Sequence, residues 1–336
     1  MRGCAVLLVV FLHWCLLEPN YRSDAYLPDW GRIGHAGVDL FFVISGFIMF
    51  VIARDYAADF RTAKTFLYHR WARIYPTYWF WFLLALGLYV SVPHWLGLEP
   101  GQMSYLVQSF FLLPTWSALL VPVSWTLKYE LYFYLVFSVI ILLPASWRIA
   151  ALIGWGGYMI AGQAICYDAP VIQCNKNLFL TMHPFGLEFL FGTLAGWLYL
   201  RGTITRPRML TLAGACLLLT GFFVYIVAGL RLDDNLWYRV LLFGLPAAVL
   251  LSGYVEMESR CAMTAPRWLI YIGTASYTIY LSHFLLLTLL FAALMRYDWL
   301  PTPWLDVLVL ALTLGIGIAA YHSVERPLLR LMRGNH

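Results

Sequence analysis

The residues best suited to chemistry are a few ionisable side chains that stand inside long apolar stretches. The first stretch holds Arg2 and His13, and a later one holds Glu130. Ionisable groups inside a bilayer are costly, and by default they indicate function. Histidine is an effective general base near neutral pH, so His13 is the first candidate for catalysis.

Arg2 and His13 are eleven residues apart in the sequence. Eleven residues are close to three turns of a helix, so both side chains would lie on one face, roughly 16 Å apart along the axis. Arg2 would stand at the cytoplasmic interface and His13 near the middle of the membrane or beyond. Two plainer interpretations stay open, in which Arg2 is a basic anchor and His13 an interfacial residue beside Trp14.

Glu130 precedes Tyr134 by four residues, which places both on one helix face. Lys128 points elsewhere, so we expect a partner for Glu130 on another helix, and a structural ion pair is the alternative.

In the second apolar stretch, Asp39 stands at the outer end and Ser45 in the middle. An interface residue and a small-residue packing patch are the alternatives for these two.

Arg70 and Arg73 are one helical turn apart and face the same way. Paired guanidinium groups suit phosphates, so they could hold a nucleotide-like carrier at the cytoplasmic face. Lipid headgroup binding is the alternative.

A polar stripe is predicted further on, where Ser276, Tyr280 and His283 recur at i, i+4 and i+7. This stripe would face other helices, and hydrogen-bonded packing is the alternative.

The composition requires these side chains to be positioned by membrane-spanning helices. Of the 336 residues 62% are hydrophobic and 12% charged, where a soluble domain has roughly 25% charged residues. Continuous apolar runs near 20 residues favour helices over a barrel. We therefore predict an all-α integral membrane protein, a bundle of about ten transmembrane helices in a single domain over 1–336 with no soluble domain.

The predicted spans lie near residues 2–17, 36–54, 75–92, 123–143, 147–165, 184–200, 209–229, 238–255, 273–295 and 304–324. The shorter run 103–114 is interpreted as interfacial or re-entrant. Basic residues gather in loops 54–74 and 201–208 and in the C-terminal tail, which puts both termini in the cytoplasm. The net charge of +5 fits such loops, and no nucleic-acid partner is expected. The chain has no Cys-x-x-Cys motif, so no metal site is expected. Cys166 and Cys174 fall in one outward loop, where they are either paired or free.

Taken together, these motifs resemble the membrane-bound acyltransferase-3 family, the O-acyltransferases that modify bacterial glycans. The resemblance spans nearly the whole chain, and it rests on Arg2-Gly3 with His13, the run Gly37–Phe47, Arg70-x-x-Arg73, Ser124-Trp125-Thr126 with Glu130, Ser276-Tyr277-x-x-Tyr280-Leu281-x-His283, and Glu325-Arg326-Pro327. The long run and the Arg2–His13 spacing are the specific pieces. Members usually carry a short lead before Arg-Gly, whereas here Met1 directly precedes Arg2.

The resemblance implies a chemistry and a set of roles. An acyl group, commonly acetyl, would pass from cytoplasmic acyl-CoA to a sugar hydroxyl at or across the bacterial inner membrane, with no permanently bound cofactor. His13 would be the essential histidine, Arg2 its partner and Glu130 an essential carboxylate. Arg70 and Arg73 would contact acyl-CoA. Supporting positions would be Asp39, Ser45, Tyr277, Tyr280, His283 and Glu325, although capping is favoured for Glu325.

Two mechanisms and two other functions stay open. His13 would either deprotonate the acceptor hydroxyl or itself carry the acyl group. A proton-coupled secondary transporter of a small polar metabolite or glycan precursor would use Glu130, His13 and His283 as a relay, but transporters often show internal repeats that are not found here. A structural scaffold predicts that none of these residues matters individually. The sequence does not reveal the oligomeric state.

Overall fold

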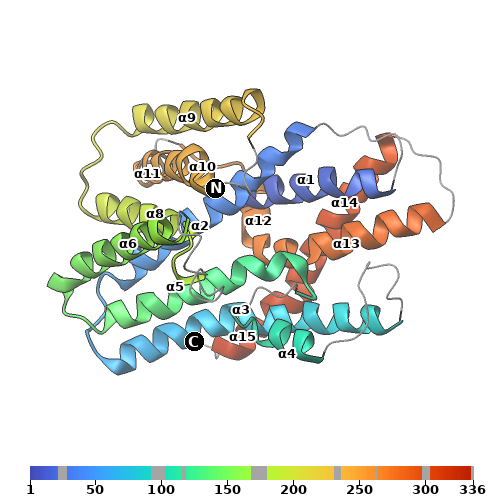
Figure 1. Cartoon of the computed structure of the whole chain (residues 1–336), viewed down its shortest axis with the longest axis horizontal. Coiled ribbons are helices and arrows are strands. Elements are labelled where there is room, and N and C mark those ends of the chain that lie inside the picture. Colours follow the sequence, from blue (N-terminus) through green and yellow to red (C-terminus); the bar gives the residue numbers. More distant parts are fainter. Residues whose placement is uncertain are drawn as a thin grey trace. The chain divides into compact units, whose positions relative to one another are not determined.

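The computed structural model describes residues 1–21, 29–91, 103–114, 119–167, 180–230, 236–261, 263–296 and 303–333. Every regular element among them is helical, which confirms the predicted all-α class (Figure 1). Seven of these helices, some of them continued through a 3-10 or π turn, are long and apolar enough to cross a membrane. The protein is therefore a multi-pass membrane protein.

The predicted spans all coincide with helices. Seven meet the length and composition of a membrane span. The other three spans fall on helices α5 (Trp125–Ile141), α6 (Ala145–Tyr167) and α8 (Phe185–Leu200). The count of ten crossings thus stays a prediction. The Cys166 side chain and Cys174, for which pairing was left open, lie outside the described residues.

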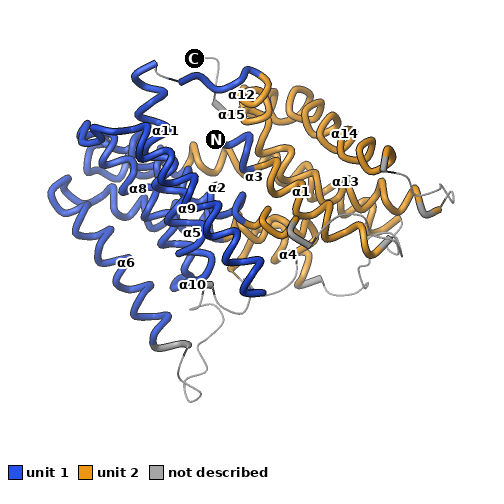
Figure 2. The backbone as a smooth tube through the Cα atoms, turned by 90° about the horizontal axis from the view of Figure 1, so that it is seen from above, with its two compact units in different colours: residues 1–5, 36–67, 129–267 blue, residues 6–35, 68–128, 268–336 orange. Residues whose placement is uncertain are grey.

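The chain forms two compact units, and each is assembled from separate stretches of sequence (Figure 2). Unit 1 comprises residues 1–5, 36–67 and 129–267, and unit 2 comprises 6–35, 68–128 and 268–336. The single-domain organisation stays a prediction. Each unit is described by itself below.

Unit 1 is built around α2 (Ala36–Ala53) and α8, whose backbones approach closely. A Cβ atom added to Gly46 would collide with the carbonyl of Phe189, and one added to Gly192 would collide with that of Val43. Small residues at such positions let membrane helices pack without intervening side chains. The Ser45–Gly46 patch is therefore a place of close helix packing, which was one of the two interpretations of these residues.

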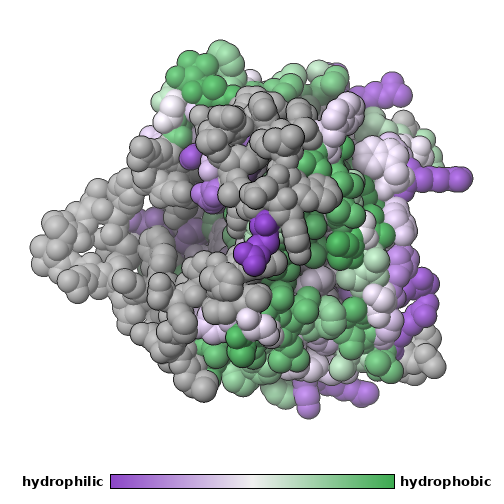
Figure 3. Space-filling view, turned by 90° about the vertical axis from the view of Figure 1, so that its right-hand side faces the viewer, coloured by the Kyte–Doolittle hydropathy of each residue, from purple (hydrophilic) through white to green (hydrophobic). Residues whose placement is uncertain are grey.

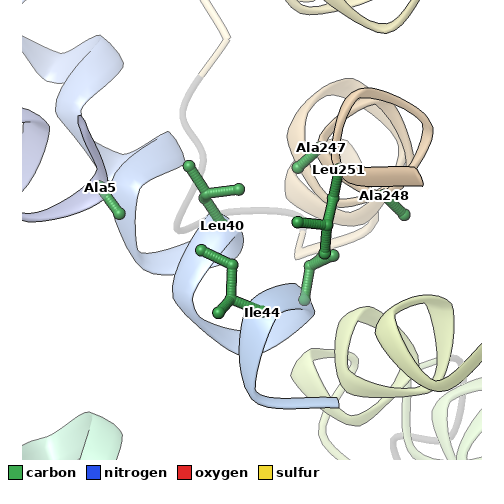
Figure 4. Close-up of a cluster of buried hydrophobic side chains, with 7 residues drawn as sticks. Ala5, Leu40, Ile44, Ala247, Ala248 and Leu251 are labelled. Carbon is green, nitrogen blue, oxygen red and sulfur yellow. The ribbon is translucent and has the colours of Figure 1, made fainter. Parts of the chain in front are cut away.

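A second contact surface in unit 1 joins α2 to α11 (Leu245–Ser259). Leu40 and Ile44 of α2 meet Ala247, Ala248 and Leu251 of α11, and Ala5 from the start of the chain completes this buried cluster (Figure 4). Unit 1 also contains most of α5, together with α6, α9 (Pro207–Val227) and α10 (Leu236–Arg239), the last of which continues through a π-helical turn, Val240–Gly244, into α11. Helix α2 thus presents its apolar residues to two neighbours and fixes where Asp39 and Ser45 lie.

Unit 2 contains most of α1 (Arg2–Tyr21) and of α3 (Phe60–Ser91), together with α13 (Ser276–Arg296) and α14 (Pro303–Ala320). Trp14 and Leu17 of α1 pack with Leu287 and Phe291 of α13 and with Val309 of α14 in one buried cluster. Its shorter elements are α4 (Met103–Phe111), α12 (Arg267–Thr274), α15 (Arg326–Arg333), the 3-10 turns Asp29–His35 and Pro122–Ser124, and the π turn Tyr321–Glu325. Packing of α1 on α13 brings His13 and His283 to one level.

Apolar side chains also cover much of the outer surface. On α9, Leu212, Leu219 and Phe223 are each more than 60% exposed, which water would penalise and lipid tails would not. Figure 3 shows hydrophobic side chains across the described part of one face, with hydrophilic ones gathered mainly along its right-hand edge. This distribution is expected of helices that meet lipid.

Candidate active site

Two predicted site residues meet where α1 and α13 pack together. His283 Nε2 lies 3.1 Å from His13 Nδ1, and the ring centroids are 4.9 Å apart. His283 is fully buried, whereas His13 is half-buried. Phe284 packs edge-on against His13, with ring centroids 5.4 Å apart. The imidazole of His13 is thus held from one side and partly accessible from another.

Backbone carbonyls assign the proton positions on both rings. His13 Nδ1 lies 3.0 Å from the carbonyl oxygen of Val9, and His283 Nδ1 lies 3.1 Å from that of Ile279. A carbonyl only accepts, so each Nδ1 must carry a hydrogen. His283 Nε2 then accepts a hydrogen bond from His13 Nδ1–H, and the same N–H also donates to the carbonyl oxygen of Val9. In the neutral imidazole, His13 Nε2 then carries the lone pair that a base or nucleophile needs.

One helical turn before His283, Tyr280 ties α13 to the start of α5. Its hydroxyl donates to the carbonyl of Val123, at 2.8 Å, and lies 2.7 Å from the hydroxyl of Thr126. Both Tyr280 and Thr126 are buried. The predicted polar stripe on α13 is therefore hydrogen-bonded at Tyr280 and at His283. Its third member, Ser276, has a buried hydroxyl with no hydrogen-bond partner among the described residues.

Tyr277 ties α13 to α3 in the same way. Its hydroxyl donates to the carbonyl of Ile74, at 2.8 Å, directly after Arg73 in the sequence. Arg70 and Arg73 are both half-buried on α3. No salt bridge to Arg73 is present among the described residues. Arg73 thus directly precedes the residue of α3 that contacts α13.

Glu325 is buried where α14 ends, in the π-helical turn Tyr321–Glu325. Thr278 of α13 donates a short hydrogen bond to its carboxylate. A π turn inside an α-helical run often accompanies a functional constraint. In this position Glu325 fastens the end of α14 to α13 rather than capping a helix terminus at the surface.

In unit 1, Glu130 accepts two hydrogen bonds. The Tyr134 hydroxyl, one turn further along α5, makes a short one, as the spacing of four residues predicts. The Ser45 hydroxyl of α2 makes a longer one, at 3.4 Å. Glu130 therefore has partners on its own helix and on another. Ser45 serves this carboxylate as well as belonging to the small-residue patch.

Asp39, predicted as a supporting residue, pairs with an arginine that sequence reasoning missed. Arg239 donates to Asp39 Oδ1 through Nε at 3.1 Å and lies within 3.0 Å through Nη2. Both side chains are at most 3% exposed. The Arg239 guanidinium group also stacks 4.7 Å above the ring of Phe185. Asp39 is thus buried inside unit 1.

Glu188 adjoins this pair and was likewise missed. It is fully buried on α8, and neither of its carboxylate oxygens has a hydrogen-bond partner among the described residues. His183 is nearby, with its ring 4.3 Å from that of Phe185. The signal for Glu188 was a carboxylate inside the apolar run 184–200, whereas nothing local to Arg239 or His183 indicated their partners.

Arg2 lies half-buried in the first turn of α1 and belongs to unit 1, as Glu130 does. The structure thus brings together His13 with His283, and Glu130 with Ser45. Tyr277, Tyr280 and Glu325 each contact other residues of unit 2. The predicted partnership of Arg2 with His13 stays a prediction.

The described helices thus bury a histidine pair in which His13 Nε2 makes no hydrogen bond to any described residue. Comparison with known families gives the class. Residues 1–322 match the model of the acyltransferase domain family, acyltransferase type 3. The chain belongs to this family, which confirms the resemblance seen in its motifs.

Three relatives narrow the comparison. The chain is 33% identical over 310 residues to the exopolysaccharide production protein ExoZ of Rhizobium meliloti, covering 89% of this chain and 90% of that protein. It is 27% identical to the acyltransferase MdmB of Streptomyces mycarofaciens, over 76% of this chain and 68% of MdmB. It is 24% identical to the peptidoglycan O-acetyltransferase OatA of Listeria monocytogenes, over 98% of this chain and 54% of OatA. No solved structure matches the chain.

Proposed function

We propose that this acyltransferase moves an acyl group, normally acetyl, from cytoplasmic acyl-CoA to a hydroxyl of an envelope polysaccharide. The observation that carries the proposal is the His13–His283 pair, because its hydrogen bonds leave His13 Nε2 unprotonated and partly accessible. The relatives support the rest, since one is an exopolysaccharide production protein and another an O-acetyltransferase. The membrane would be the bacterial inner membrane, with both termini in the cytoplasm.

The proposed reaction uses His13 as a general base. The acceptor hydroxyl oxygen attacks the thioester carbonyl carbon while its proton passes to His13 Nε2. A carbon–oxygen bond forms, the carbon–sulfur bond breaks, and the proton ends on the sulfur of CoA. The charge that develops on His13 is stabilised by its Nδ1–H, which donates to Val9 and to His283 Nε2. His283 is a positioning residue in this account.

Arg70 and Arg73 are proposed to hold the phosphates of CoA. They are half-buried, face one way on α3, and adjoin the Ile74–Tyr277 contact that links α3 to α13. From Tyr277 to His283 is six residues, about 9 Å along a helix. A donor anchored at the arginines would therefore extend along α13 toward His13. Glu130 is proposed as a further essential carboxylate, held by Tyr134 and Ser45.

The test is transfer of label by the purified protein in liposomes. With acetyl-labelled acetyl-CoA and a polysaccharide acceptor, we expect label in alkali-labile esters of the acceptor. Absence of ester label, together with uptake of a labelled glycan precursor into the liposomes, would overturn the proposal in favour of a transporter.

A matched set of variants tests the donor site. Arg70→Ala and Arg73→Ala should each raise the KM for acetyl-CoA at least about tenfold, with kcat changed only a few-fold, because a phosphate contact is lost. Arg61→Ala is the control, since Arg61 is an exposed arginine on the same helix. Equal KM values for all three variants would remove Arg70 and Arg73 from the donor site.

A further inference from the structure

A small cavity in unit 2 shares a wall with the candidate base. It is bounded by α3, by residues 120–122 and by α13, and one of its lining side chains is Phe284. The same Phe284 ring packs edge-on against the His13 imidazole. The cavity also lies further along α13 than Tyr277 and Tyr280, since it reaches Leu285 and Thr288. Its lining on α13 runs from Leu281 to Thr288, so the cavity lies at the level of His283 along this helix.

The lining is almost entirely apolar. Trp81 and Ala85 of α3, Pro122, and Leu281 and Leu285 of α13 form most of the wall. Thr288 contributes the one hydroxyl group of the lining, and it donates to the carbonyl of Phe284 at 2.8 Å. A sugar ring would have to give up hydrogen bonds to water here without replacement, which costs several kcal/mol per group. A hydrocarbon group would lose nothing.

The size of the cavity limits what it can hold. Its volume is about 30 Å³ on the scale where one water needs roughly 10–15 Å³. That is room for two or three groups the size of a methyl, so an acetyl group fits and a long acyl chain does not.

One donor in the wall lacks an acceptor. Trp81 is 3% exposed, and its indole N–H has no hydrogen-bond partner among the described residues. A buried donor without an acceptor is costly, and a ligand carbonyl oxygen would relieve that cost. A thioester carries such an oxygen directly beside its short alkyl group.

Resting on the proposed acyl transfer, we infer that this cavity is the acyl pocket of the enzyme. It takes the alkyl part of a short acyl thioester beside His13, and Trp81 Nε1–H donates to the thioester carbonyl. The bulk of Leu285 and the small size of Ala85 set which chain lengths react.

The experiment compares kcat/KM for acetyl-CoA, butyryl-CoA and hexanoyl-CoA in the purified full-length protein. Leu285→Ala should raise the butyryl-to-acetyl ratio at least about tenfold, because it enlarges the pocket. Ala85→Leu should lower acetyl transfer at least about tenfold, because it fills the pocket. Leu84→Ala is the control, since Leu84 is 42% exposed on α3 and does not line the cavity. Leu285→Val removes less volume and gives the same direction if Leu285→Ala does not fold.

Trp81→Phe tests the proposed donor separately. It keeps an aromatic ring but removes the N–H, so kcat should fall about tenfold or more while the ratio between chain lengths is nearly unchanged. Folded Leu285 variants with the wild-type ratio would overturn the acyl-pocket assignment. Failure of the wild-type protein with every acyl-CoA would instead overturn the proposed donor, so the two failures are distinguishable.

Discussion

The His13–His283 pair of unit 2 and the Asp39–Arg239 pair of unit 1 both place polar groups inside apolar helices, but they differ in what they leave available. Asp39 and Arg239 are buried on all sides, and their opposite charges face each other at 3.0 Å. His13 is half-buried, and its hydrogen bonds to described residues use Nδ1 alone. An ionisable group within a membrane helix is therefore not by itself catalytic. What distinguishes the two pairs is whether a reactive atom is left without a hydrogen bond to the protein, as His13 Nε2 is among the described residues.

The largest effect is expected from removing Arg239, the cation of the buried pair in unit 1. Arg239→Ala leaves Asp39 and Glu188 without a counter-charge, and breaking such a pair costs about 3–5 kcal/mol. We expect little folded protein in detergent-solubilised membranes, measured by size-exclusion chromatography and thermal unfolding.

Two variants make this first prediction specific. Arg201→Ala should fold normally, because Arg201 is an exposed arginine of the same unit. Combining Asp39→Asn with Arg239→Gln should recover part of the lost stability by removing both charges. If Arg239→Ala alone unfolds at the wild-type temperature, the pair is not a structural element.

The next effect concerns the packing that positions Asp39 and Ser45. Gly46→Ala should lower the free energy of unfolding by about 1–3 kcal/mol, because the added Cβ meets the Phe189 carbonyl and the helices must separate. Thermal unfolding measures this. Gly87→Ala is the matched control, since a Cβ there meets no atom within 4 Å, and it should be neutral or slightly stabilising. Equal melting temperatures for the two variants would contradict close packing of α2 on α8.

A smaller effect is expected at the partner of the candidate base. His283→Ala removes the acceptor for His13 Nδ1–H, so kcat should fall about 10- to 100-fold with KM for acetyl-CoA nearly unchanged. His283→Gln offers an amide oxygen as acceptor and should recover part of the loss. Steady-state kinetics on folded protein provide the measurement. A rise in KM without loss of kcat would assign His283 to substrate binding instead.

The smallest effect is expected at Ser45. Its hydrogen bond to Glu130 is long, at 3.4 Å, and Tyr134 continues to hold the same carboxylate. Ser45→Ala should therefore change kcat less than about threefold, since a neutral hydrogen bond contributes roughly 0.5–1.5 kcal/mol. A loss of a hundredfold or more in the kinetic assay would show that Ser45 takes part in the reaction directly.

Much of the fold could be predicted because a continuous apolar run of about 20 residues indicates a helix without any information from the rest of the chain. The runs gave helices at all ten predicted places, and one-turn spacings correctly put Tyr134 beside Glu130. Pairings across the chain could not be predicted. Asp39 and Arg239 are 200 residues apart, and His13 and His283 are 270 apart. No local pattern says which helices pack together, so His13 and His283 were both singled out without being paired.

The central claim is that His13 carries the reaction through Nε2, and His13→Ala tests it most directly. We expect folded His13→Ala protein, reconstituted at wild-type amounts, to transfer acetyl from acetyl-CoA to the acceptor at least about a thousandfold more slowly than wild type. Transfer within tenfold of wild type by the folded variant would contradict the claim, whether His13 acts as the general base or itself carries the acyl group.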